Sequence, residues 1–270
     1  MATALISCLV LAVSYVGSLY TTNSSLPRDH PSTIKQRMLT VSIVCIVGPI
    51  FVYFVADQDT RLTFFRHLGI NLNNIGFATL LPLSLTTILF AGPIILYLLT
   101  EGIEGIREDI ITIEHFSDLK WYRTVVVAPI SEELIFRACM MPLLVPVYGV
   151  VQSIFIAPLF FGVAHFHHIW EEIKKGNEVS KVLLVSCFQF LYTTVFGIYS
   201  AFIFLRTGNI MGPILCHSFC NMIGFPDFGA VPHCKNPLLV GFMFILGSIL
   251  FSFLLFPLTS PYIHESIYWS

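Results

Sequence analysis

The stretch VVVAPISEELIFR, residues 125–137, places three ionisable side chains inside an otherwise apolar run: Glu132, Glu133 and Arg137. Each such residue costs about 2.5–3.5 kcal/mol at the centre of a membrane helix on an insertion scale. Three of them nearly cancel the insertion energy of a modest span. They must therefore face a protected cavity, pair with one another, or lie near the membrane interface, and a solvated helix start at the interface is the simplest alternative.

Helix geometry gives the two acids different environments. Glu133 and Arg137 are four residues apart with the acid first, the favourable order for an ion pair on one helix face. Glu132 lies about 100° around the helix from Glu133, so its carboxylate points elsewhere. Pro129 is typical of a first helical turn, and a helix that begins there would favour an ionised Glu132 through its positive end. One paired acid and one spare acid is the arrangement that a general base requires.

The composition predicts the surroundings of this stretch. Of 270 residues, 56% are hydrophobic and 11% are charged, and the mean hydropathy is +0.81. Soluble domains are about 45–50% apolar and about 25% charged. The net charge of −2 gives no basic field for a polyanion. We therefore exclude a soluble enzyme, a disordered protein and a nucleic-acid binder. The sequence predicts an all-α transmembrane helix bundle, one domain over residues 1–270.

Because a span needs about 20 apolar residues, we expect about eight spans around an internal polar cavity. The apolar segments are 2–20, 39–56, 75–100, 124–140, 142–164, 182–205, 210–225 and 237–259. We interpret the first as a retained helix rather than a signal peptide, because no Lys or Arg precedes it. Residues 101–123 alternate charges with isoleucines, as an amphipathic interfacial helix does. Asn23 begins a glycosylation sequon, which conflicts with the orientation that the basic residues of its loop indicate.

Two further polar groups interrupt apolar runs. FGVAHFHH, residues 161–168, closes one run, but its histidines show neither HExxH nor another zincin spacing. A single histidine at the end of a span is commonly structural. His217 and Asn221 are four apart, so they share a face of a helix that we expect to start at Pro213. In apolar surroundings both need partners, and a hydrogen bond between helices would also satisfy them.

Three motifs occur in order on separate apolar segments: Glu132-Glu133-x-x-x-Arg137, Phe161-x-x-x-His165 and His217-x-x-x-Asn221. Together they resemble the signature of the type II CaaX prenyl endopeptidases, the Ras-converting enzyme family. The resemblance covers about residues 120–225, the expected catalytic core. It implies a multi-pass protease of the endoplasmic reticulum membrane, which removes the C-terminal tripeptide from farnesylated or geranylgeranylated CaaX proteins such as Ras-type small GTPases.

The resemblance also implies roles for six residues. Glu132 and His165 would activate the attacking water, His217 and Asn221 would stabilise the oxyanion, and Glu133 and Arg137 would support them. These roles agree with the chemistry of amide hydrolysis, which needs a base for water, a proton for the leaving amine and donors for the oxyanion. They require no metal, cofactor or covalent intermediate.

Two other functions fit the same residues. A zinc-dependent membrane protease would use His165, His168 and His217, with Glu132 as a further ligand. A non-enzymatic transporter or scaffold would use the buried charges as an ion path. In every case the lipid bilayer is a partner of the chain and nucleic acid is not.

Overall fold

A computed structural model describes residues 1–21, 26–102, 105, 118–166, 169, 172–173 and 176–269. The regular structure of these residues is entirely helical, which confirms the all-α prediction. The predicted amphipathic segment 101–123 falls mostly outside the described residues, and Asn23 lies outside them as well.

The N-terminal part consists of α1 (Ala2–Ser18), α2 (Pro31–Val55), the short α3 (Gln58–Leu62) and α4 (Phe64–His67), and the pair α5 (Ile75–Leu89) and α6 (Ala91–Thr100). The central part consists of α8 (Leu119–Tyr122), the π-helical η3 (Arg123–Val127), α9 (Ala128–Glu133), the π-helical η4 (Leu134–Cys139) and α10 (Met141–Ala164). The C-terminal part consists of α12 (Val179–Thr207), α13 (Met211–Ile223), the 3₁₀ turn η5 (Val231–His233), α14 (Pro237–Leu258) and α15 (Pro261–His264).

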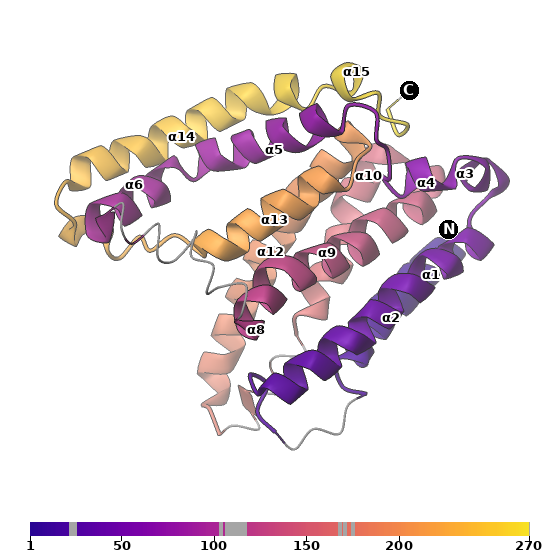
Figure 1. Ribbon diagram of the computed structural model, residues 1–270, viewed down its shortest axis with the longest axis horizontal. Helices are drawn as coiled ribbons and strands as arrows, with labels where there is room; N and C mark the ends of the chain where they lie inside the picture. Colours follow the sequence, from indigo (N-terminus) through magenta and orange to yellow (C-terminus); the bar gives the residue numbers. More distant parts are fainter. Residues whose placement is uncertain are drawn as a thin grey trace.

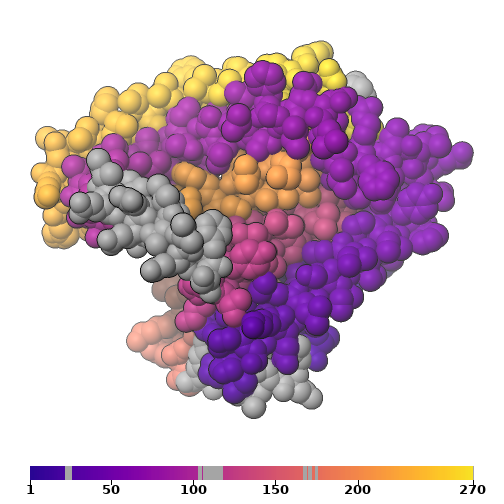
Figure 2. Space-filling model, in the orientation of Figure 1, coloured from indigo at the N-terminus to yellow at the C-terminus, as the bar shows by residue number. Residues whose placement is uncertain are grey.

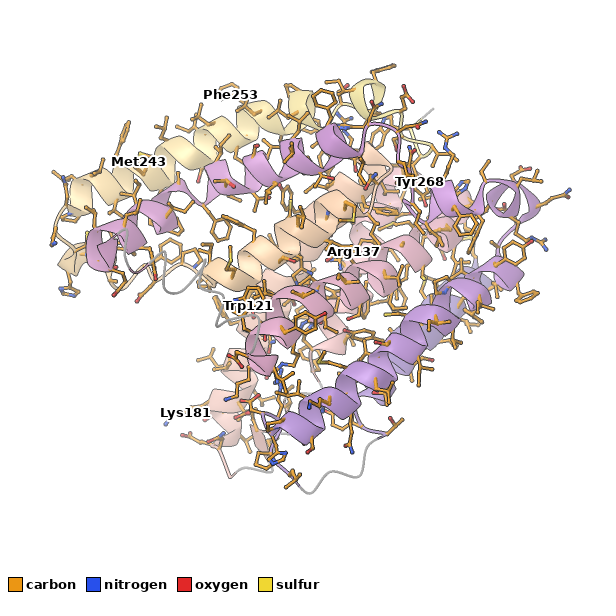
Figure 3. All side chains as sticks on the ribbon, viewed as in Figure 1. Trp121, Arg137, Lys181, Met243, Phe253 and Tyr268 are labelled. Atoms are coloured by element: carbon orange, nitrogen blue, oxygen red, sulfur yellow. The ribbon has the colours of Figure 1, made fainter. Side chains whose placement is uncertain are left out.

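Several helices can cross a membrane. Among the described residues, α2, α10, α12 and α14 are long and apolar enough to do so. Helices α5 and α6, which are bent by 62° relative to each other, make a fifth span if they are counted together as one broken span. Phe253 and Met243 of α14 project away from the other helices (Figure 3), and Phe253 is 75% exposed. This apolar outer surface is that of a multi-pass membrane protein, whereas the count of eight spans remains a prediction.

The helices form two outer groups with a central one between them (Figure 1). Helices α5, α6 and α14 lie together along one side, and α1 and α2 lie along the other. Helices α9, α10, α12 and α13 lie between these groups. In the space-filling view the surfaces of α9 and α13 are visible between α5 and α1–α2 (Figure 2).

The helix that carries the first motif begins earlier than Pro129. Its backbone is helical from Leu119 through α8, η3, α9 and η4 into α10, and Asp118 caps its start by accepting from Lys120 N at 2.8 Å. Pro129 therefore lies inside the helix, and the predicted start there is wrong. The ring of a proline crowds the preceding helical turn, and its nitrogen carries no N–H for the helix. The wide π-helical turn before Pro129 leaves room for this ring. Because the helix begins at Leu119, Glu132 lies too far from its start to be stabilised by its positive end.

A break at Gly149 divides α10. Its φ of +78° and ψ of 168° are far from helical values, and glycine adopts this conformation without a side-chain penalty. The break separates the helix of Glu132 from the helix that ends at Ala164, with His165 as its C-cap. His165 thus closes an apolar helix, as the sequence indicated.

Helix α14 packs closely against α5 at Gly247. A Cβ at Gly247 would lie 2.4 Å from the backbone oxygen of Ile88, whereas a Cβ at Gly241 would meet nothing within 4 Å. Both glycines are on α14, so they form a matched pair that differs in this contact.

We predict that Gly247→Ala destabilises the protein by about 1–3 kcal/mol, because the new methyl group overlaps a carbonyl that cannot move alone. Gly241→Ala should be neutral or slightly stabilising, since alanine favours a helix by about 1 kcal/mol over glycine. Thermal unfolding in detergent measures both variants. Equal stability of the two would contradict the packing of α14 on α5.

Candidate active site

A pocket of about 1260 Å³ lies among the central helices. Its lining includes the four predicted catalytic residues, Glu132, His165, His217 and Asn221. They come from α9, the end of α10 and α13. The fold therefore brings residues up to 89 positions apart to one pocket, while Glu133 and Arg137 are buried outside its lining.

Glu133 is the most connected group of the site. Its side chain is fully buried, and it accepts from Ser200 Oγ at 2.5 Å and from His217 Nδ1 at 2.7 Å. Arg137 Nη1 lies 3.1 Å from the same carboxylate. The predicted ion pair between Glu133 and Arg137 is therefore present. A buried charge is tolerated when it is paired and hydrogen-bonded in this way.

Arg137 lies at the centre of the helices (Figure 3) and is 1% exposed. Its guanidinium carbon is 4.4 Å from the ring centroid of Phe161, the distance of a cation–π contact. The rings of Phe161 and His165 in turn pack edge-to-face, with centroids 4.8 Å apart. Phe161, the first residue of the second motif, thus joins the buried charges to the histidine of the pocket.

Glu132 is the acid that reaches the pocket, with 18% of its side chain exposed. Its Oε2 lies 3.7 Å from His217 Nε2. Its Oε1 accepts a long hydrogen bond of 3.5 Å from the Tyr15 hydroxyl. The prediction of one paired and one spare acid needs correction, because the two acids contact opposite nitrogens of His217. Glu132 nevertheless remains the less enclosed of the two.

The contacts of His217 fix its protons. An ionised carboxylate only accepts hydrogen bonds, so the 2.7 Å contact with Glu133 places a proton on Nδ1. In the neutral ring, Nε2 then carries a lone pair, and it faces Glu132. Only the doubly protonated ring donates at both nitrogens.

His165 and Asn221 are each oriented by a backbone carbonyl. His165 Nδ1 is 2.8 Å from Phe161 O, so Nδ1 carries the proton and Nε2 is the basic nitrogen of the neutral ring. Asn221 Nδ2 donates to Thr124 O at 2.9 Å, which ties α13 to η3 and leaves a second N–H on the same nitrogen. His217 and Asn221 share a face as predicted, although α13 starts at Met211 rather than Pro213. Asn209 Oδ1 caps that start by accepting from Met211 N.

Sequence analysis missed Tyr15 of α1. Its buried hydroxyl is 3.0 Å from Ser131 Oγ and 3.5 Å from Glu132. Its ring packs edge-on against Phe136 at 5.5 Å between centroids. The sequence held a signal, because Ser7, Tyr15 and Ser18 place hydroxyls at helical spacing in a mostly apolar segment, and the structure buries all three.

The described part of the chain does not provide the ligands that a zinc-dependent protease would need. Within it, no group of three or more His, Cys, Asp or Glu side chains is placed to hold a metal ion. His168, one of the ligands in that hypothesis, lies outside the described residues, as does His167.

The fold and the pocket define a multi-pass membrane protein with a carboxylate–imidazole site. Residues 116–223 match the family model of the type II CAAX prenyl endopeptidase Rce1-like proteins. The chain is 44% identical to CAAX prenyl protease 2 of Homo sapiens, over 97% of this chain and 82% of the human protein. It is 33% identical to CAAX prenyl protease 2 of Saccharomyces cerevisiae, over 81% of this chain and 78% of the yeast protein. No solved structure gives a significant match.

The chain belongs to the CAAX prenyl protease 2 family and is a protease of the CaaX-processing class. This confirms the family that the three motifs indicated. The similarity also extends over nearly the whole chain, well beyond residues 120–225.

We predict that Glu133→Gln and Arg137→Met each lower the yield of folded protein. Each leaves a buried partner without its counter-charge, which costs about 3–5 kcal/mol. Size-exclusion profiles and thermal unfolding in detergent measure this effect. Glu178→Gln is the matched control, because Glu178 pairs with Lys181 at 3.1 Å but both side chains are more than half exposed.

Exchanging the two charges in Glu133→Arg/Arg137→Glu should not restore the yield. Ser200 and His217 both donate to position 133, and an arginine there accepts nothing. Recovery of the exchanged pair to the wild-type level would show that the ion pair alone matters and would contradict the three-partner arrangement.

Proposed function

We propose that this chain is a protease of the endoplasmic reticulum membrane that removes the C-terminal tripeptide from farnesylated or geranylgeranylated CaaX proteins, Ras-type small GTPases among them. The observation that carries this proposal is the common pocket of Glu132, His165, His217 and Asn221. Its support is the family, whose members in several organisms are named CAAX prenyl protease 2.

The pocket offers both environments that a prenylated peptide needs. Most of its lining is apolar and aromatic, including Phe90, Phe155, Phe196 and Phe251. A C15 or C20 chain gains about 0.8 kcal/mol for each CH₂ group that it buries. Glu132, His165, His217 and Asn221 supply polar groups to the same pocket, and the peptide bond would be held beside Glu132. We infer that this pocket is the predicted internal cavity.

We also propose that the chain forms one domain of about eight spans, with its catalytic core at residues 120–225. The continuous helix from Leu119 to the break at Gly149 supports a span beyond those defined by length and composition. At about 1.5 Å per residue it exceeds the roughly 30 Å thickness of the hydrocarbon core. The shorter helices α1 and α13 would complete the count.

In the proposed mechanism Glu132 removes a proton from the attacking water. His165 Nε2, the basic nitrogen of the neutral ring, accepts a hydrogen bond from the same water, and Glu132 then passes the proton it has taken to the leaving amine. The second N–H of Asn221 Nδ2 donates to the oxyanion. Donation from His217 Nε2 requires the doubly protonated ring, and the carboxylates of Glu132 and Glu133, one beside each nitrogen, would offset its charge.

Mass spectrometry of a farnesylated CaaX peptide tests this function directly. We predict that the purified wild type releases the C-terminal tripeptide and that Glu132→Gln loses at least about 100-fold of the rate, the contribution of a general base. Glu178→Gln should cleave at the wild-type rate. An unchanged rate in a folded Glu132→Gln protein would remove Glu132 from this role, and no cleavage by the wild type would overturn the proposed function.

Tyr15→Phe tests how Glu132 is oriented. We predict a decrease in kcat of about 3- to 30-fold, because the variant loses one hydrogen bond to a charged group, while KM and folded yield stay near the wild-type values. The phenylalanine keeps the ring contact with Phe136. Tyr53→Phe, at a half-exposed ring of α2, is the control. Equal kcat in wild type and Tyr15→Phe would show that the hydroxyl is structural only.

A further inference from the structure

The lining of the pocket carries positive charge that the proposed mechanism does not use. Arg28, Arg37 and Arg123 line the pocket, and Glu132 is the single carboxylate among its described lining residues. Cations that face a pocket with a mostly apolar lining favour an anionic group in whatever binds there.

Arg123 and Glu132 lie on one continuous wall. The central helix contributes pairs of lining residues that recur every four positions, on one helix face: Arg123, Thr124, Val127, Ala128, Ser131 and Glu132. Between the charged ends this wall consists of small, uncharged side chains. A peptide can therefore extend along it from the site of cleavage to the guanidinium group.

The length of that wall matches a tripeptide. Arg123 precedes Glu132 by nine positions on this helix, which corresponds to at most about 14 Å at the α-helical rise of 1.5 Å per residue. Three extended residues span about 10 Å. The remaining distance is within the reach of a long arginine side chain.

An ion pair with Asp29 orients the guanidinium group of Arg123 and leaves it able to bind a carboxylate. Arg123 Nη1 donates to Asp29 Oδ1 at 2.9 Å, and Arg123 is the more enclosed partner, with 23% exposure against 52% for Asp29. The hydrogen bond from Arg123 lowers the pKa of Asp29 below its usual value, so Asp29 stays ionised at neutral pH. Because the contact uses one of five N–H donors, the planar fork keeps donors for a second carboxylate.

We propose that Arg123 binds the terminal α-carboxylate of the substrate and thereby places the third peptide bond from the C-terminus beside Glu132. This inference rests on the proposed function. It gives a physical reason why the enzyme would remove three residues rather than another number. One end of the tail is fixed by charge, and the bond at the other end meets the base.

The test compares two farnesylated peptides that differ only in their C-terminus, a free acid and a carboxamide. We expect the wild type to prefer the acid by about 10- to 100-fold in kcat/KM, the usual contribution of a hydrogen-bonded charge pair. In Arg123→Gln this ratio should fall towards one, mainly through a higher KM for the acid. Lys120→Gln is the matched control, because Lys120 lies 4.0 Å from the same Asp29 but does not line the pocket.

Each outcome has one meaning. A wild type that cleaves both peptides equally well overturns the carboxylate site but leaves the proposed function intact, whereas a wild type that cleaves neither overturns the function. Equal losses on both peptides in Arg123→Gln, or an equal fall of the ratio in Lys120→Gln, also overturn the proposal. If Arg123→Gln does not fold, Arg123→Lys, which keeps the charge but loses the fork, should lower the ratio part of the way, and an unchanged ratio would count against the site.

A phosphate group of an anionic lipid has similar chemistry, so the assay is run in neutral detergent with and without added phosphatidylserine. Persistence of the acid preference and of its loss in Arg123→Gln without lipid assigns the site to the peptide. A preference that appears only when the lipid is added would overturn that assignment.

Discussion

The burial of the Glu133 carboxylate is the constraint on which the rest of the site depends. An isolated carboxylate in this environment would be far too costly, and three groups from three helices compensate it: Arg137 one turn along, Ser200 of α12 and His217 of α13. The chain can satisfy this carboxylate only when those helices are docked. The same contacts that stabilise the fold therefore set the orientation of His217, so stability and site geometry are coupled.

The two adjacent acids therefore have different roles. The oxygens of Glu133 accept hydrogen bonds from buried donors, so Glu133 cannot serve as a base. Glu132 reaches the pocket and has only longer contacts, with Tyr15 and His217. The π-helical turns on both sides of α9 belong to the same arrangement. They change the angular spacing of side chains locally, and such widened turns are frequent at functional sites.

The helical class, the family and the ion pair of Glu133 with Arg137 could be predicted from the sequence, because each depends on local spacing or composition. Sequence reasoning misplaced the helix starts at Pro129 and Pro213. Proline is tolerated inside a helix beside a wide π-helical turn, as at Pro129, and within a first turn, as at Pro213 two residues after Met211. Sequence reasoning could not foresee that Glu133 bonds Ser200 or that Tyr15 reaches Glu132. Those contacts join residues 67 and 117 positions apart, and packing alone determines them.

The same helix holds the two ends of the proposed cleavage site. A site assembled only from separate helices would let the distance between base and carboxylate anchor vary as the bundle moves in the bilayer. Glu132 and Arg123 instead share one continuous helix. The groups proposed to stabilise the oxyanion lie on α13, which the contact between Asn221 and Thr124 ties to that helix. Small shifts of α13 would then change the rate of the chemical step, while the number of residues removed stays fixed by the length of a single helix.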